Sequence, residues 1–189
     1  MIGAILTAGN VDFKWDTEFD LGALKADGTL PFGQLPYIED GDAKMAQGWG
    51  CVRYAARKAG LQGDNDAEFA LSEMLIEEAH DLYDLMAKAM YAEGDKAAAW
   101  ADCVEKLKAQ YAYLEKLLPG DSPYFKAGDK RLAGGICVAC LIDLNVLCLG
   151  ADLSDWMPSN VPKLTAFFNA MKELPCLKNF ESMNPYFKK

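Results

Sequence analysis

The sequence predicts a short α/β unit followed by an all-helical bundle. Residues 1–61 mix strand and helix signals, whereas residues 66–189 carry apolar side chains at helical spacing almost throughout. The polar segment 62–66 lies between them and contains Gly63 and helix-capping side chains. We therefore expect one domain over residues 1–61 and a second, all-helical domain over residues 66–189.

Composition and charge narrow the function classes. The 189 residues are 51% hydrophobic and 25% charged, which is typical of a globular chain. A net charge of -9 argues against nucleic acid or an anionic membrane surface as a partner. The six cysteines stand in apolar, helix-like contexts, and residues 1–9 lack the basic segment of a secretory leader. We expect reduced thiols in a cytoplasmic or other reducing compartment.

The first part of the chain shows three local signals. Val11, Phe13 and Trp15 alternate with polar residues, which predicts a half-buried strand. Two short runs, 37–39 and 43–46, flank a tight-turn sequence and predict a β-hairpin. Pro36 comes immediately before the hairpin, and a helix over residues 48–59 follows it.

Four long helices are predicted in the second part, over residues 67–92, 96–118, 132–149 and 162–174. The third is apolar on nearly all sides, which is typical of either a membrane span or the buried centre of a bundle. Because amphipathic helices flank it and could surround it, the bundle is favoured, without membrane insertion.

Two motifs suggest metal or redox chemistry, and both have simpler explanations. The pair Cys137 and Cys140 forms a Cys-x-x-Cys motif, but it lies inside an apolar helix, which favours buried structural thiols. Glu77 and His80 have metal-ligand spacing, yet a di-iron bundle needs a second such motif and the chain has one histidine. We therefore predict no metal site, and interpret the glutamate as part of a solvated acidic face with Glu73, Asp81 and Asp84.

A family resemblance starts from the run Pro31-Phe32-Gly33-Gln34-Leu35-Pro36 and from Ala46-Gln47-Gly48. These motifs resemble the glutathione site of sigma-like glutathione transferases, which are related to the S-crystallins and to glutathione-dependent prostaglandin D synthase. The segment 123–129 is similar to the turn ahead of the buried helix of that family. The resemblance covers nearly the whole chain. It implies a thioredoxin-like N-terminal domain and a helical C-terminal domain, the glutathione transferase fold.

The resemblance assigns glutathione contacts to residues of this chain. Pro36 would be a cis-proline, Leu35 would offer its backbone N–H and C=O to the cysteinyl part, and Gln34 would contact the peptide backbone. Gln47 and Gly48 would hold the γ-glutamyl carboxylate at a helix N-terminus, where backbone N–H groups favour anions.

The resemblance also assigns two charged contacts and reveals differences from the family. Lys25 matches a lysine that pairs with the glycyl carboxylate, and Glu77 falls where an acid of the partner subunit reaches the γ-glutamyl amine. Gly48 replaces a family serine, at a loss of roughly 1–3 kcal/mol if the site is dry. Leu21 replaces a tryptophan, and the inserted residues 26–28 could shift Lys25.

Two further differences from the family concern the start of the buried helix and the start of the chain. Residues 132–135 lack the capping box of the family's buried helix, at an expected cost of about 1 kcal/mol. Residues 1–9 match the middle of the first helix, so the first strand and its loop, about 15 residues, are missing from the sequence. In the family that strand ends in the tyrosine or serine that stabilises the glutathione thiolate. None of Tyr37, Tyr54 or Tyr83 matches it, and no catalytic residue is assigned.

Two functions follow from the resemblance. One is a transferase-fold protein that has lost catalysis, with weak or absent glutathione binding, and acts as a binding or structural subunit. It would form a homodimer or a larger protein assembly. The alternative is an active glutathione transferase, by thiolate conjugation or isomerisation, whose polypeptide begins earlier. In that case the tyrosine would lie upstream of Met1, or another chain would fill the gap.

Overall fold

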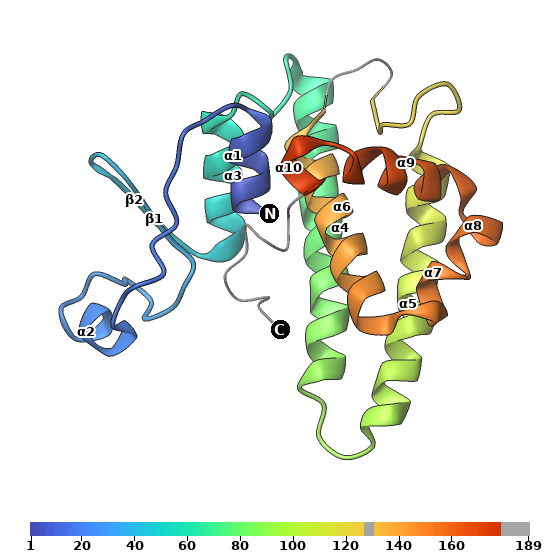
Figure 1. Cartoon of the computed structure of the whole chain (residues 1–189), viewed down its shortest axis with the longest axis horizontal. Coiled ribbons are helices and arrows are strands. Elements are labelled where there is room, and N and C mark those ends of the chain that lie inside the picture. The colour runs from blue at the N-terminus through green and yellow to red at the C-terminus, as the bar shows by residue number, and fades with distance from the viewer. Residues whose placement is uncertain (127–130, 179–189) are drawn as a thin grey trace.

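The computed structural model describes residues 1–126 and 131–178. Figure 1 shows a hairpin and a short helix on one side and a helical bundle on the other. The elements are α1 (Ile2–Ala8), α2 (Leu21–Ala26), β1 (Tyr37–Asp40), β2 (Ala43–Ala46), α3 (Gly48–Lys58), α4 (Asp66–Met90), α5 (Lys96–Leu117), α6 (Ala133–Leu149), α7 (Ala151–Ser154), α8 (Met157–Asn160), α9 (Pro162–Lys172) and α10 (Pro175–Lys178).

The predicted hairpin is confirmed. β1 and β2 pair antiparallel, with Tyr37 opposite Ala46 and Asp40 opposite Ala43. Gly41, in the turn, has a φ of 59°, a conformation that glycine adopts at little cost. The hairpin leads directly into α3, which lies beside α1 (Figure 1). A proline, a hairpin and a helix start therefore follow in the predicted order.

The strand predicted at Val11, Phe13 and Trp15 is wrong. The sheet formed by the described residues contains only β1 and β2, and residues 11–20 form no strand. Phe13 and Trp15 remain 38% and 42% exposed, with their rings edge-to-face, and the Trp15 ring packs beside Gly3 of α1. Alternation fixes which side chains share a face, but a strand also needs a neighbouring backbone for its hydrogen bonds.

The four predicted long helices are confirmed as α4, α5, α6 and α9, with ends that differ by one or two residues. The Asn65 side chain accepts a hydrogen bond from Glu68 N–H at 3.0 Å, and Asp95 accepts one from Ala98 N–H at 3.0 Å. Both are N-cap bonds that the polar residues before each helix had suggested.

The short helices α7, α8 and α10 were not predicted. Residues 127–130 of the family-like turn and the tail 179–189 lie outside the described residues.

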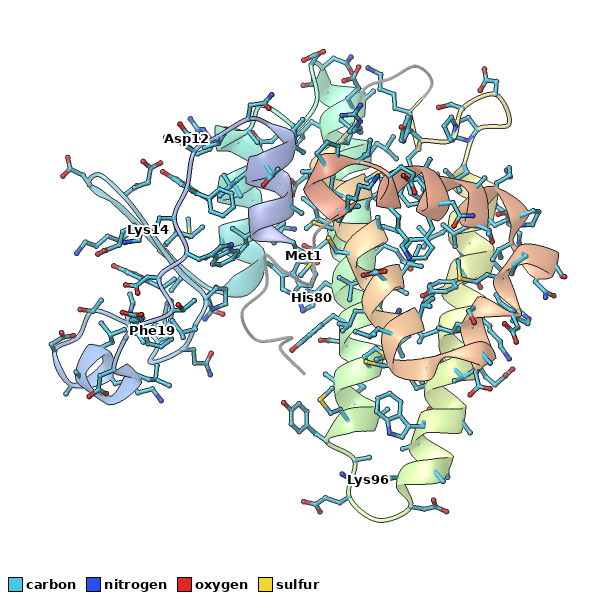
Figure 2. The ribbon with its side chains drawn as sticks, in the orientation of Figure 1. Met1, Asp12, Lys14, Phe19, His80 and Lys96 are labelled. Carbon is cyan, nitrogen blue, oxygen red and sulfur yellow. The ribbon has the colours of Figure 1, made fainter. Side chains whose placement is uncertain are left out.

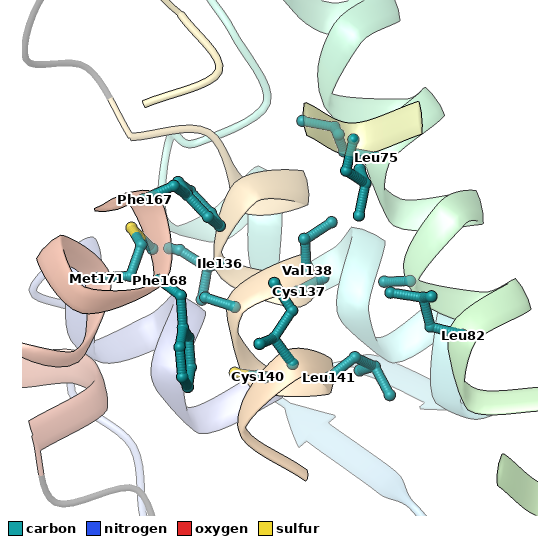
Figure 3. Close-up of a cluster of buried hydrophobic side chains, with 14 of the residues drawn as sticks. Leu75, Leu82, Ile136, Cys137, Val138, Cys140, Leu141, Phe167, Phe168 and Met171 are labelled. Atoms are coloured by element: carbon teal, nitrogen blue, oxygen red, sulfur yellow. The ribbon is translucent and has the colours of Figure 1, made fainter. Parts of the chain in front are cut away.

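Helix α6 forms the buried centre of the bundle, as predicted. All residues from Ala133 to Ile142 are buried, and α6 packs most extensively against α4 and also against α9. Figure 3 shows the cluster, in which Leu75 and Leu82 of α4 and Phe167 of α9 surround the α6 side chains. No helix among the described residues is long and apolar enough to cross a membrane.

The first turn of α6 obtains its capping bonds from its neighbours. Leu132, the N-cap residue, provides no side-chain cap, in line with the missing capping box. Instead, Ala133 N–H donates to the Leu61 carbonyl at 2.8 Å and Gly134 N–H donates to Ser72 Oγ at 3.2 Å. The cost expected for the missing cap is therefore offset, because a loop and α4 accept the free N–H groups.

Candidate functional site

The candidate glutathione site begins in the loop between α2 and β1. The Leu35–Pro36 peptide bond is cis, as the resemblance implied. Leu30 is buried and anchors the loop, with Gly33 N–H donating to the Leu30 carbonyl at 2.9 Å. Gln34 and Leu35 are exposed and are therefore accessible to a ligand.

Helix α2 places Lys25 beside this loop. Asp20 caps the helix by accepting hydrogen bonds from Gly22 and Ala23 N–H at 2.8 and 3.1 Å. A Cβ built on Gly33 would lie 3.9 Å from Lys25 Cε, so the lysine side chain runs along the loop. With residues 26–28 inserted, the Lys25 side chain lies beside Gly33 of the loop. Leu21, where the family has tryptophan, is 39% exposed at the start of the same helix.

The N-terminus of α3 completes this part of the site. Gln47 is the N-cap residue and has φ 73° and ψ 117°, a region that non-glycine residues rarely occupy. Residues held in such conformations cost about 1–3 kcal/mol and cluster at functional sites. Gly48 follows, and a Cβ built on it would lie 3.7 Å from Pro36 Cδ. The cis-proline and the start of α3 are therefore neighbours.

Cys51 lies beneath these residues and was not singled out from the sequence. Its side chain is fully buried, and its thiol donates to the Met45 carbonyl at 3.4 Å, with the Pro36 carbonyl at 3.9 Å. Burial raises the pKa of the thiol, so it remains protonated and able to donate. One side chain of α3 thus packs against the open end of the hairpin, where β1 begins and β2 ends.

Glu77 lies apart from the other assigned residues, on α4. It forms an ion pair with Arg53 of α3, and this guanidinium holds the pKa of the Glu77 carboxyl below its usual value. His80 Nδ1 lies 3.7 Å from the other carboxylate oxygen, and the His80 ring packs on Trp49, with centroids 4.7 Å apart. The structure thus brings together Lys25, Gln34, Leu35, Pro36, Gln47 and Gly48. Glu77 lies instead at the α3–α4 junction.

Sequence reasoning missed Arg53, although a signal was present. Trp49 and Arg53 are four residues apart on α3, as are Glu73 and Glu77 on α4. Residues with this spacing share a helix face. The opposite charges of Arg53 and of the two glutamates, each on one face of a predicted helix, could therefore have suggested that these two faces meet.

Two tyrosines near the hairpin, Tyr37 and Tyr54, direct their hydroxyls to carboxylates. Tyr54 donates to Asp40 at 2.8 Å, and this hydrogen bond raises the pKa of Tyr54. Tyr37 donates to Glu39 at 3.2 Å, and desolvation raises the pKa of Tyr37. Both hydroxyls already have carboxylate acceptors.

The two cysteines of the Cys-x-x-Cys motif are packed in the core. Cys137 and Cys140 are buried, and burial raises the pKa of both thiols (Figure 3). The prediction that they are buried is confirmed. The described residues contain no group of three or more histidine, cysteine or acidic side chains that could hold a metal ion.

Known proteins are similar to this chain in sequence and in fold. Human glutathione S-transferase A3 is 29% identical over 181 residues, which are 93% of this chain and 79% of that protein. The chain is similar to glutathione transferases over nearly its whole length. No protein-family model matches it.

Solved glutathione transferase structures share the fold. A pi-class enzyme of Onchocerca volvulus superposes with a TM-score of 0.76 at 23% identity, covering 98% of this chain and 91% of that chain. The sigma-class enzyme of Fasciola hepatica gives a TM-score of 0.75 at 20% identity, covering 95% and 88%. The fold class is therefore confirmed as a thioredoxin-like N-terminal part with a helical C-terminal part. The boundary between residues 61 and 66 stays a prediction.

Proposed function

We propose that this glutathione transferase-fold protein binds glutathione weakly and acts as a binding or structural subunit rather than as a conjugating enzyme. The observation that carries the proposal is Gly48 at the N-terminus of α3. The backbone N–H groups that favour an anion are retained there, but the position provides no side-chain hydroxyl. Lys25, Gln34, Leu35, Pro36 and Gln47 would supply the remaining contacts.

Titration of the 189-residue chain with glutathione tests this proposal. NMR of ¹⁵N-labelled protein suits weak binding, and the amides of residues 33–36 and 47–50 should shift with a dissociation constant well above the micromolar range. A low-micromolar dissociation constant would overturn the proposal that glutathione binds weakly. Shifts elsewhere on the chain, without any at these residues, would overturn the site itself.

The second candidate is an active glutathione transferase, and the backbone of Gln47 favours it. A conformation with φ 73° is costly, and residues held in such conformations cluster at functional sites. Conjugation of glutathione to 1-chloro-2,4-dinitrobenzene separates the two candidates. We expect the spontaneous rate only, because Tyr37 and Tyr54 already donate to carboxylates. A rate that increases with protein concentration would favour the enzyme.

We also propose a homodimer or larger protein assembly in a cytoplasmic or other reducing compartment. Phe32 of the site loop is 64% exposed, Tyr83 of α4 is 44% exposed, and Tyr91, the C-cap residue of α4, is 77% exposed. Exposed aromatic side chains of this size are typical of interaction surfaces. Light scattering after size exclusion should give at least twice the 20.7 kDa mass of the chain. A monomer that persists at high concentration would contradict this.

A further inference from the structure

Cys51 contacts three segments of the chain that meet at the candidate site. Its N–H donates to the Gln47 carbonyl at 2.8 Å in the first turn of α3. Its thiol donates to the Met45 carbonyl at 3.4 Å, and the Pro36 carbonyl lies 3.9 Å from the same sulfur. One residue thus joins the end of β2, the residue before β1 and the N-cap of α3.

The thiol is suited to this place by its proton as well as by its size. Cys51 is fully buried, so water does not compete for its hydrogen bond. A thiol has one proton and donates weakly, and the shorter distance assigns that proton to the Met45 carbonyl. The Pro36 carbonyl is the alternative acceptor. An aliphatic side chain here would leave both carbonyls without this donor.

The first turn of α3 packs closely against the segments that Cys51 contacts. A Cβ built on Gly48 would lie 3.7 Å from Pro36 Cδ, and a Cβ built on Gly50 would lie 3.4 Å from Met45 Sδ. Figure 2 shows the side chains of the hairpin and of α3 where these two elements meet. A shift of the hairpin along α3 would therefore move Pro36 relative to Gly48.

The same contacts support the backbone of Gln47. Its φ of 73° is costly for a residue with a side chain, and such a conformation persists only where its surroundings hold it. The Gln47 carbonyl accepts from Cys51 N–H, and Met45, two residues earlier, accepts from the Cys51 thiol. The unusual conformation is therefore held by bonds to one residue.

We propose that Cys51 is a positioning residue for glutathione binding. By holding the Met45 and Pro36 carbonyls against α3, it fixes the Leu35 backbone relative to the N–H groups at the start of that helix, so that both reach one ligand. The inference rests on the proposed binding of glutathione and names a buried residue that would govern it without touching the ligand.

Three substitutions separate the donor from the bulk of the side chain. Cys51→Ser keeps a donor, Cys51→Ala removes it and leaves space, and Cys51→Val removes it and fills the space. Each variant is titrated with glutathione by NMR after its amide spectrum has shown that it is folded. Cys51→Ser should bind within about twofold of wild type, whereas Cys51→Ala and Cys51→Val should bind at least about threefold more weakly, because the lost bond is weak but buried.

A second measurement reports on the contact without any ligand. The ¹³C chemical shift of a carbonyl responds to a hydrogen bond donated to it. The Met45 carbonyl shift should move in Cys51→Ala and Cys51→Val and should be largely restored in Cys51→Ser. The same change in all three variants, or none in any of them, would overturn the role of the thiol as a donor.

Cys103→Val is the matched control, because Cys103 is also buried but lies on α5, which packs mainly against α4 and α9. It should keep the wild-type affinity even if it lowers stability. Equal weakening by Cys51→Ser and Cys51→Val would overturn the inference, since it would indicate a role in packing alone. If wild type binds no glutathione, the proposed function fails, and positioning for that ligand fails with it. If wild type binds and folded Cys51→Val binds equally well, the inference alone fails.

Discussion

A Cβ built on Gly48 would lie 3.7 Å from Cδ of Pro36, which is an ordinary van der Waals distance. The site therefore has room for a larger residue at this position. We predict that Gly48→Ser tightens glutathione binding about tenfold, because the hydroxyl adds a donor for the γ-glutamyl carboxylate. The same NMR titration measures it.

Gly48→Ala is the control for this change, since it adds the Cβ without the hydroxyl. It should leave the dissociation constant within about twofold of wild type. Equal affinities for the serine and alanine variants would show that the position does not contact the ligand carboxylate.

Gly134 lies where α6 approaches α4 closely. A Cβ built there would lie 2.3 Å from the Ser72 carbonyl oxygen and 2.6 Å from Leu75 Cβ. We predict that Gly134→Ala lowers the free energy of unfolding by about 1–3 kcal/mol, because the helices must separate. Urea denaturation measures the change.

The adjacent glycine provides a matched comparison. A Cβ on Gly135 would meet its nearest ring carbons, on Phe125 and Phe167, at 3.9 Å. Gly135→Ala should therefore be neutral or stabilise the protein by up to about 1 kcal/mol through helix propensity. Similar losses from both substitutions would contradict the close approach of α6 to α4.

Glu78 carries a buried carboxylate oxygen without a hydrogen-bond partner among the described residues. Burial, with a contribution from Asp81, raises the pKa of Glu78 in the folded state. The folded protein therefore binds this proton more tightly than the unfolded chain, and stability is lost as the pH rises through that window. We predict that Glu78→Gln raises the free energy of unfolding by about 1 kcal/mol at pH 7.

The pH dependence distinguishes the removal of a titrating buried carboxylate from a stabilising effect that does not involve titration. The gain from Glu78→Gln should shrink as the pH falls below the ordinary glutamate range, where both states are protonated. Glu93→Gln, at an exposed position, should change stability by less than about 0.5 kcal/mol at either pH. A gain for Glu78→Gln that is independent of pH would argue against a titrating carboxylate.

Tyr111 and Asn145 form a fully buried polar pair between α5 and α6. The Asn145 amide donates to the Tyr111 hydroxyl at 3.0 Å. Tyr111→Phe leaves this donor without its partner, so we predict a loss of about 1–3 kcal/mol in urea denaturation. A double-mutant cycle with Asn145→Ala should show a coupling of at least about 0.5 kcal/mol. Strict additivity would mean that the pair does not interact.

The parts of the fold that local patterns determine were predictable from the sequence. Asn65 and Asp95 marked helix starts through their own side chains, and Pro36 and the hairpin stood in the order that the structure shows. The alternation of Phe13 and Trp15 failed as evidence for a strand, because pairing depends on a second backbone that the pattern does not describe.

The site was predictable to the same extent. The residues around Pro36 are neighbours along the chain or across one hairpin, and their grouping followed from the motif. The position of Glu77 depends on Arg53, on a different helix, and the packing under Pro36 depends on Cys51. Contacts of this kind come from how helices pack, and the four-residue spacing on α3 and on α4 is compatible with the Arg53–Glu77 contact without determining it.

The capping of α6 by Ser72 and by the Leu61 carbonyl has a consequence for the order of folding. An isolated helix of this sequence would have free N–H groups in its first turn and would fray there. These groups gain acceptors only when α4 and the loop at Leu61 are in place. We therefore expect α6, the most apolar of the long helices, to form against α4 after α4 has folded. Its apolar surface would then be exposed only briefly during folding.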